Sequence, residues 1–229
     1  MITWCKRHPI QFMTLYLVFY LSFFTLLENN IVPVVILHCP LDDLIPFVKY
    51  AIIPYYLWFA WIVGTLFWQL YRAPKREFWR LCLPLFAGMT IALMICAIVP
   101  NGVNLRPAAI PGNDIFARLV RGLWSADTST NVCPSIHVFN SLTLDFAFQR
   151  SSLLTGRRGR AVRWGAHLLD VAVILSTMLL KQHSVIDVVC GMVLAVTVDR
   201  AAAAVETHLV RRPAPLSGAK PAHPALERE

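Results

Sequence analysis

The chain has 229 residues, of which 57% are hydrophobic and only 15% are charged, and its formal net charge is +8. Soluble domains have roughly 25% charged residues, so this composition excludes an ordinary water-soluble globule. The high apolar content also excludes a disordered or collagen-like chain, and six cysteines are too few for a disulfide-stapled scaffold of this length. The composition predicts an integral membrane protein.

Uncharged stretches bounded by charged or turn residues predict an all-α bundle of six transmembrane helices. The basic start at Lys6-Arg7 resembles a signal peptide. The apolar run that follows is too long for one and no small-residue cleavage site precedes Glu28, so we interpret it as a retained anchor. The last three spans contain His or Asp, and we expect them to face the bundle interior or a cavity. The first predicted span is Ile10–Leu27, the second lies between Lys49 and Arg72, and the third begins after Arg80 and ends near Pro100. The last three are about Ser135–Gln149, Trp164–Leu180 and Ser184–Ala204.

Residues 31–48, between the first two predicted spans, are apolar but contain three prolines and two Asp. Irregular backbone at membrane depth survives only where protein covers it, so we expect an interfacial or re-entrant segment here and no seventh span. The membrane catalytic domain is predicted over 1–208. The Pro-, Ala- and Gly-rich residues 209–229 are predicted to form a disordered cytoplasmic tail.

The loop between the third and fourth spans contains one helical pattern. Asn113-Asp114 can cap a short helix whose face carries Ile115, Phe116, Leu119, Val120, Leu123 and Trp124. We interpret it as a helix lying in the outer headgroup layer; a lid over a functional site is the bolder alternative.

Basic residues are distributed unevenly across the six predicted spans. Sixteen of the 21 Lys and Arg fall on the side of the N-terminus and five on the other side. The positive-inside bias predicts that both termini are cytoplasmic in a multi-pass protein of the cell membrane. The positive charge then reflects topology and contact with anionic lipid, and no nucleic-acid partner is expected.

Three short polar segments are predicted to meet at the outer membrane face. Residues 101–107 follow the third span, residues 133–137 begin the fourth, and residues 181–187 connect the last two. The candidate functional residues in them are Arg106, Ser135, His137, Lys181, His183 and Asp187.

Two histidines and a carboxylate suggest catalysis. His183 and Asp187 are four residues apart, so they share a face if a helix begins here. The carboxylate can hold one ring nitrogen as N–H and leave the other free as nucleophile or base. His137 has the chemistry to protonate a leaving oxygen.

The other three candidates suit phosphate. Arg106 offers a bidentate fork and Lys181 a point charge. Ser135 adds a hydroxyl at a helix N-terminus, which Pro134 favours and whose amides bind anions. Together these groups predict phosphoryl transfer. A metal site of His137, His183 and Asp187 is the less favoured alternative, because two basic side chains beside it would repel a cation.

These residues make the chain similar to the type 2 phosphatidic acid phosphatase superfamily of membrane enzymes. Pro134-Ser135-Ile136-His137 matches the second family motif, Pro-Ser-x-His. Ser176, His183 and Asp187 match the third motif, and Arg106-Pro107 the end of the first. The resemblance covers residues 80–200. It implies a helical bundle, a phosphohistidine intermediate and no metal or other cofactor.

The resemblance also implies residue roles. His183 would be the nucleophile, Asp187 its orienting partner and His137 the general acid, while Arg106 and Ser135 would bind phosphate. Val99 and Thr177 replace a Lys and an Arg of the family motifs, and Lys181 is a candidate substitute.

We therefore expect a lipid phosphatase that hydrolyses a phosphomonoester or pyrophosphate headgroup at the extracytoplasmic face. The alternative within the same machinery is a phosphotransferase with a lipid or sugar hydroxyl acceptor, similar to inositol phosphorylceramide synthases. A transporter that binds phosphate without cleaving it is a third alternative, which the paired His183 and Asp187 disfavour. The expected partners are a phosphorylated lipid and membrane lipids.

The sequence leaves two interpretations open for each of two further groups of residues. Asp145, His167 and Asp170 should lie at one depth, either as a proton relay or, as we favour, as a hydrogen-bonded cluster between helices. Cys39 and Cys133 are the two cysteines predicted outside, and they form either a disulfide or free thiols, of which a buried thiol at Cys133 is the default.

Overall fold

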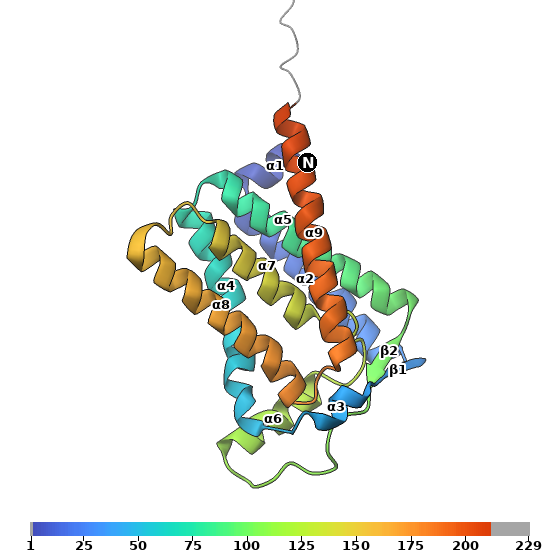
Figure 1. Cartoon of the computed structure of the whole chain (residues 1–229). Coiled ribbons are helices and arrows are strands. Elements are labelled where there is room, and N and C mark those ends of the chain that lie inside the picture. The colour runs from blue at the N-terminus through green and yellow to red at the C-terminus, as the bar shows by residue number, and fades with distance from the viewer. Residues whose placement is uncertain (1, 212–229) are drawn as a thin grey trace, which may run out of the picture.

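The structure, a computed structural model, describes residues 2–211 and is mostly helical (Figure 1). A short 3-10 helix, η1, leads into α4, and two strands of three residues each are also present. In chain order the elements are α1 (Ile2–Arg7), α2 (Pro9–Asn30), β1 (Val35–Leu37), α3 (Pro40–Leu44), η1 (Lys49–Ala51), α4 (Ile52–Arg72), α5 (Lys75–Ile98), β2 (Asn101–Val103), α6 (Ile115–Ala126), α7 (Ile136–Arg150), α8 (Gly156–Leu179) and α9 (Val185–Arg211).

Five helical stretches within residues 2–211 are long and apolar enough to cross a membrane: Pro9–Asn30, Lys49–Arg72, Lys75–Ile98, Gly156–Leu179 and Val185–His208. Their outward faces expose large Leu, Val, Ile and Phe side chains, such as Leu15, Leu168 and Val193. Contiguous apolar surface of this kind suits lipid and not water. The fold is that of a helical membrane protein, as the composition predicts.

The predicted fourth span is observed as α7, which is a short central helix. Its 15 residues rise about 22 Å, less than the roughly 30 Å of a bilayer core. It packs against α4, α5, α8 and α9, which surround it in Figure 1. Most of its side chains are buried, polar ones included. The sequence thus predicts the position of α7 correctly, whereas its crossing of the membrane remains a prediction.

Two glycines allow neighbouring helices to approach α7 closely. A Cβ at Gly88 of α5 would lie 1.9 Å from the ring of Phe139, and a Cβ at Gly191 of α9 would lie 2.7 Å from the carbonyl oxygen of Ser135. The start of α7 therefore rests directly on the backbone of α9. Backbone contact continues where the N–H of Ser135 donates to the carbonyl of Asp187 at 3.0 Å.

Residues 31–48 form β1 and α3 at one end of the bundle. β1 pairs in parallel with β2, with Val35 opposite Asn101 and Leu37 opposite Val103. These strands are a departure from the all-α prediction; they are too short for any periodic pattern in the sequence. They tie the segment after α2 to the end of α5.

The loop helix α6 is confirmed. Its N-cap is Asp114, whose carboxylate accepts a hydrogen bond from the N–H of Ala117 at 3.0 Å. Val120 and Leu123 are buried against the start of α4 and the end of α8, whereas Ile115 of the predicted apolar face is exposed.

The two described ends of the chain lie together. Figure 1 places α1 and the last turns of α9 at one end of the bundle, and α3, α6 and the two strands at the opposite end. Helix α9 continues to Arg211, so the first three residues of the predicted tail are helical. The remainder of that tail, residues 212–229, lies outside the described residues.

Candidate active site

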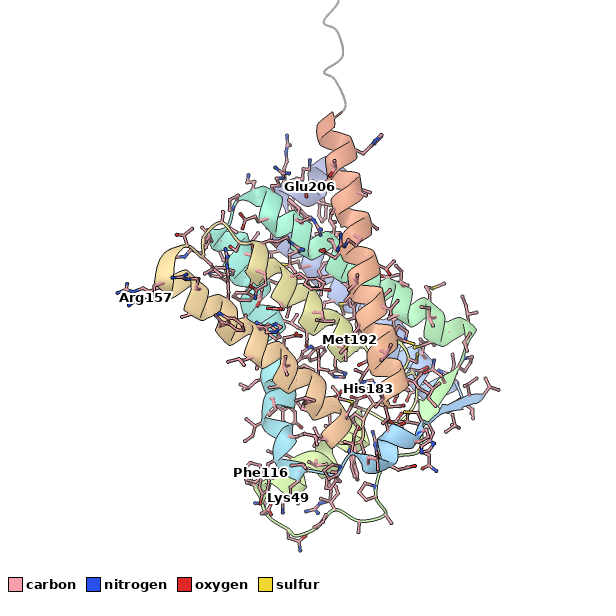
Figure 2. The ribbon with its side chains drawn as sticks, viewed as in Figure 1. Lys49, Phe116, Arg157, His183, Met192 and Glu206 are labelled. Atoms are coloured by element: carbon pink, nitrogen blue, oxygen red, sulfur yellow. The ribbon has the colours of Figure 1, made fainter. Side chains whose placement is uncertain are left out.

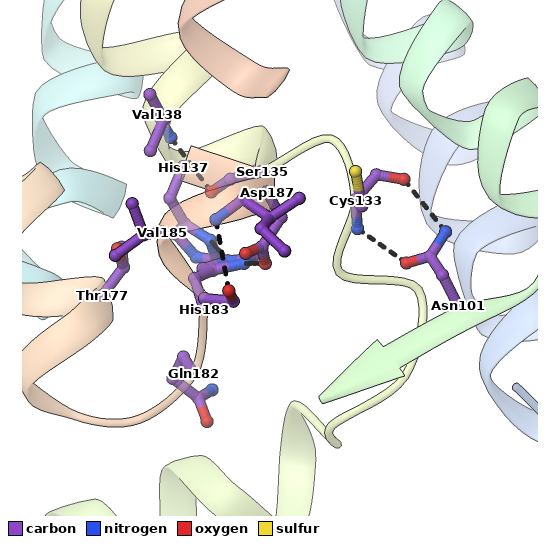
Figure 3. A network of polar contacts seen from close by, with 12 residues as sticks. Asn101, Cys133, Ser135, His137, Val138, Thr177, Gln182, His183, Val185 and Asp187 are labelled. Atoms are coloured by element: carbon purple, nitrogen blue, oxygen red, sulfur yellow. Dashed lines mark hydrogen bonds and ion pairs between the residues drawn. The ribbon is translucent and has the colours of Figure 1, made fainter. Parts of the chain in front are cut away.

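The two candidate histidines meet in the structure. Nε2 of His183 lies 3.2 Å from Nδ1 of His137, and Nδ1 of His183 lies 2.6 Å from Oδ2 of Asp187 (Figure 3). His137 and His183 are 6% and 7% exposed, and Asp187 is fully buried. The short contact with the carboxylate fits a His183 tautomer with N–H at Nδ1 and a lone pair at Nε2.

Aromatic side chains of α4 hold the ring of His137. The ring centroids of Trp58 and Tyr55 lie 4.4 and 4.7 Å from that of His137. Both aromatic residues are buried. Because His137 is packed on two rings, its Nδ1 is directed at His183 by shape as well as by the hydrogen bond.

Helix α9 begins on a carboxylate from a distant segment. Asp42 of α3 accepts hydrogen bonds from the hydroxyl of Ser184 at 2.7 Å and from the N–H of Val185 at 2.8 Å. It thereby caps the N-terminus of the helix that carries Asp187, as an N-cap side chain would. Burial raises the pKa of Asp42, but hydrogen bonds from Ser184, Val185 and Cys39 outweigh burial and bring it below its usual value.

Lys181 lies at the same junction. Its φ of 56° is in the left-handed region, and its ammonium donates to the carbonyl oxygen of Asp42 at 2.7 Å. The side chain is 9% exposed. The structure thus gives Lys181 a contact with α3, and the predicted contact with phosphate stays a prediction.

Arg106 lies in a polar network beside the histidines. Its guanidinium donates to the carbonyl oxygens of Trp124 at 3.0 Å and Asp127 at 2.6 Å, and to Oε1 of Gln182 at 2.5 Å. It also lies over the ring of Trp124, 5.2 Å from the centroid. Burial lowers the pKa of this guanidinium, against the opposing charge of Asp127. Arg106 therefore contacts Gln182, the residue next to the predicted nucleophile His183, and has no hydrogen bond to His183 itself among the described residues.

Asp127 links that network to the aromatic wall. Its carboxylate accepts hydrogen bonds from the hydroxyl of Tyr55 at 2.7 Å and from Nε2 of Gln182 at 3.2 Å. Burial raises the pKa of Asp127, and the hydrogen bond from Tyr55 opposes the shift. Asp127 therefore connects the residues around His137 to those around Arg106.

Ser135 is the N-cap of α7. Its hydroxyl oxygen accepts from the N–H of Val138 at 3.4 Å, and the residue is fully buried. Besides His183 and Asp187, the third motif includes the positions of Ser176 and Thr177. Their hydroxyls donate hydrogen bonds to carbonyls within α8, those of Val173 and Ile174 respectively. Val99 is half exposed at the end of α5.

Cys39 and Cys133 are free thiols in the structure, as are the other four cysteines. Cys39 caps α3, whereas the backbone of Cys133 is held by the amide of Asn101 through two hydrogen bonds (Figure 3). Of the two alternatives for this pair, the structure has the free thiols.

The candidate site contains no group of three metal-ligating side chains among residues 2–211. Comparison of the chain with protein-family models, with curated proteins and with solved structures gives no match.

Sequence reasoning missed five residues that surround the histidines: Asp42, Tyr55, Trp58, Asp127 and Gln182. Gln182 lies within one predicted polar segment, and Asp42 and Asp127 are acidic residues in loops next to predicted spans. Their polarity and position are signals of a possible functional role, but they do not indicate which residue each side chain contacts. Tyr55 and Trp58 look like ordinary membrane-helix aromatics in the sequence.

Proposed function

We propose that this protein is a membrane phosphatase that removes phosphate from a lipid headgroup through a phosphohistidine on His183. The observation that carries the proposal is the relay Asp187–His183–His137, with contacts of 2.6 and 3.2 Å between side chains that are almost fully buried. Phosphate binding alone does not require an oriented imidazole opposite a second one.

In the proposed reaction Nε2 of His183 attacks phosphorus and the bond to the leaving oxygen breaks. Asp187 holds the Nδ1 proton and stabilises the positive charge that develops on the ring. His137 donates a proton to the leaving oxygen, then takes a proton from the water that attacks the phosphohistidine. His183 and free phosphate result.

The hydrogen bond between the two imidazoles bears on substrate entry. A phosphoryl group that reaches Nε2 of His183 must take the place of Nδ1 of His137 there. We propose that Arg106, Ser135 and the first amides of α7 receive its oxygens, since a guanidinium and a helix N-terminus both favour anions. Arg106 would exchange the contact with Gln182 or a carbonyl for phosphate.

The proposed membrane arrangement has six spans, with α7 as the fourth, and residues 31–48 at the interface. Both termini would be cytoplasmic and the site extracytoplasmic. The 16-to-5 division of basic residues supports this orientation. The motif resemblance to the type 2 phosphatidic acid phosphatase superfamily supports both the reaction and the bundle.

A phosphotransferase is the second candidate. Val99 and Thr177 stand where the family motifs have cations, and the histidines are nearly closed to solvent. A closed site favours a bound hydroxyl acceptor over bulk water. The chemistry at His183 is the same in both cases.

The test is phosphate release by the purified protein from a panel of lipid phosphates and pyrophosphates, with and without lipid and sugar hydroxyl acceptors. We expect release by the wild type, acid-labile phosphate trapped on the protein, and neither with His183→Ala. His38→Ala is the matched control, because His38 is an exposed histidine paired with Asp43. Transfer to an acceptor without free phosphate would select the transferase, and normal turnover by His183→Ala would rule out both.

A further inference from the structure

Helices α7 and α8 bring three titratable side chains together away from the candidate active site. Nδ1 of His167 lies 2.9 Å from Oδ2 of Asp145, and the ligand atoms of these residues and Asp170 all lie within 4.8 Å of one another. From His167 to Leu179 helix α8 advances twelve residues and rises about 18 Å, so the cluster is well separated from His183.

Asp170 is the unusual member of this cluster. It is 1% exposed, and its Oδ1 has no hydrogen-bond partner within residues 2–211. Asp145, by contrast, accepts from Nε2 of Gln149 at 2.8 Å as well as contacting His167. A buried carboxylate without a partner is unfavourable, and two carboxylates this close repel each other when both are charged. A cation between the two would satisfy both.

We propose that Asp145, His167 and Asp170 bind one divalent transition-metal cation. His167 and Asp170 are three residues apart on the face of α8 that meets α7. Carboxylates and histidines with this spacing on facing helices build the metal sites of other helical bundles. Metal–ligand distances of about 2.1 Å place two ligand atoms at most about 4.2 Å apart, so a contraction of about half an ångström would close the site.

The ligand set also indicates which cation. One imidazole nitrogen with two carboxylates suits Zn²⁺ or Mn²⁺, whereas Mg²⁺ and Ca²⁺ prefer oxygen ligands alone. The side chain of His167 is 46% exposed, so the cluster is not closed off by protein on the side of His167. The neighbouring guanidinium of Arg163 donates to the carbonyl of Ser151 at 3.0 Å and so is directed elsewhere.

The test uses the tag-free full chain in detergent, stripped with a chelator and titrated with Co²⁺ as a spectroscopic probe and with Zn²⁺ as competitor. We expect one equivalent of Co²⁺ with d–d absorption bands, displaced by Zn²⁺ and not by Mg²⁺. Electron spin-echo spectroscopy should detect one imidazole nitrogen on the bound ion. His167→Gln and Asp170→Asn should each weaken binding at least tenfold.

His38→Gln is the matched control, since His38 and Asp43 form an exposed imidazole–carboxylate pair at 2.9 Å. It should bind Co²⁺ as the wild type does. Wild-type protein that binds no Co²⁺, or an ion without an imidazole ligand, would overturn the proposal without any variant having to fold. Unchanged binding by folded Asp170→Asn would do so too, and would leave a protonated hydrogen-bonded cluster as the explanation of Asp170.

Discussion

At the scale of single residues, Asp42 contacts residues about 140 positions further along the chain. Its carboxylate caps α9, and its carbonyl oxygen holds the ammonium of Lys181. The residues between these two contacts include His183. The geometry of the candidate nucleophile therefore depends on a carboxylate that takes no part in the proposed reaction.

We expect Asp42→Ala to lower the free energy of unfolding by about 2 kcal/mol, the size of a lost charged cap or hydrogen bond. Asp43→Ala is the matched control: Asp43 is the exposed neighbour, and its substitution should cost less than about 0.5 kcal/mol. Thermal unfolding in detergent measures both. Equal effects would show that Asp42 is not the cap that positions α9.

The same residue predicts a pH dependence. The folded-state pKa of Asp42 is below its ordinary value of 3.8, so its stabilising contribution is complete above that value and is lost as the pH falls through the folded pKa. The stability difference between wild type and Asp42→Ala should therefore be constant from pH 5 to 7 and shrink in more acidic buffer. A difference that grew on acidification would contradict this sign.

The kinetics and stability of Lys181 variants can distinguish a structural role of this side chain from a role in phosphate binding. Because its ammonium is bound to the carbonyl of Asp42, we expect Lys181→Ala to lower thermal stability and to reduce kcat/KM less than tenfold in protein that stays folded. Arg106→Ala should reduce kcat/KM at least 100-fold, about the effect of removing an oxyanion contact. A large kinetic loss at Lys181 with unchanged stability would make Lys181 the substitute for the missing family cations.

His137 gives the sharpest kinetic prediction. General acids contribute about 10²–10⁴-fold, and less where the leaving group is already acidic. His137→Ala should therefore lose far more activity on an alkyl phosphate than on an aryl phosphate with an acidic phenol, measured as kcat/KM for each. Equal losses on both substrates would argue against protonation of the leaving oxygen.

At the scale of elements, the site depends on how closely α7 and α9 pack. Gly191→Ala would place a Cβ 2.7 Å from the carbonyl oxygen of Ser135. A backbone atom cannot move aside as a flexible side chain does. We therefore expect the free energy of unfolding to fall by about 1–3 kcal/mol and kcat to decrease. Gly165→Ala on α8, with open space around it, should be neutral or stabilising by up to about 1 kcal/mol. Unfolding and kinetics of the two variants give the comparison.

What the sequence predicts well is local. The spacing of His183 and Asp187 places them on one turn, Pro134-Ser135 starts α7, and Asp114 caps α6. Contacts across the chain are not encoded in any spacing. Asp42 with Ser184, Arg106 with Gln182, and Tyr55 with Asp127 arise only when the helices pack, and for that reason the polar segments were found while their partners were not.

At the scale of the whole molecule, the candidate site lies toward one end of the bundle, and the two ends of the described chain, residues 2 and 211, lie at the other. Figure 2 places Lys49 and Phe116 at one end, with His183 nearer to them, and Glu206 and Arg157 toward the other. The end with Arg157 is also rich in basic residues. From the positive-inside bias we propose that this end is cytoplasmic and that the candidate site is outside.

This orientation predicts the accessibility of two exposed positions, Ala109 in the loop before α6 and Arg158 at the start of α8. Ser184, in the same predicted outer region, is fully buried and unsuited to labelling. In a protein with its six native cysteines replaced by Ser, we expect Ala109→Cys to react with a membrane-impermeant maleimide on intact cells. Arg158→Cys should react only after permeabilisation.

The matched control is the cysteine-free parent, which should stay unlabelled in both conditions, and the thermal stability of each variant verifies that the bundle is intact. The physical reason for the expected pattern is the cost of moving many Lys and Arg across the bilayer, which favours the orientation with sixteen of 21 on the cytoplasmic side. If Arg158→Cys reacted on intact cells and Ala109→Cys did not, the orientation of the protein in the membrane would be the reverse of the one proposed. The proposed phosphatase would then act on lipids of the cytoplasmic leaflet.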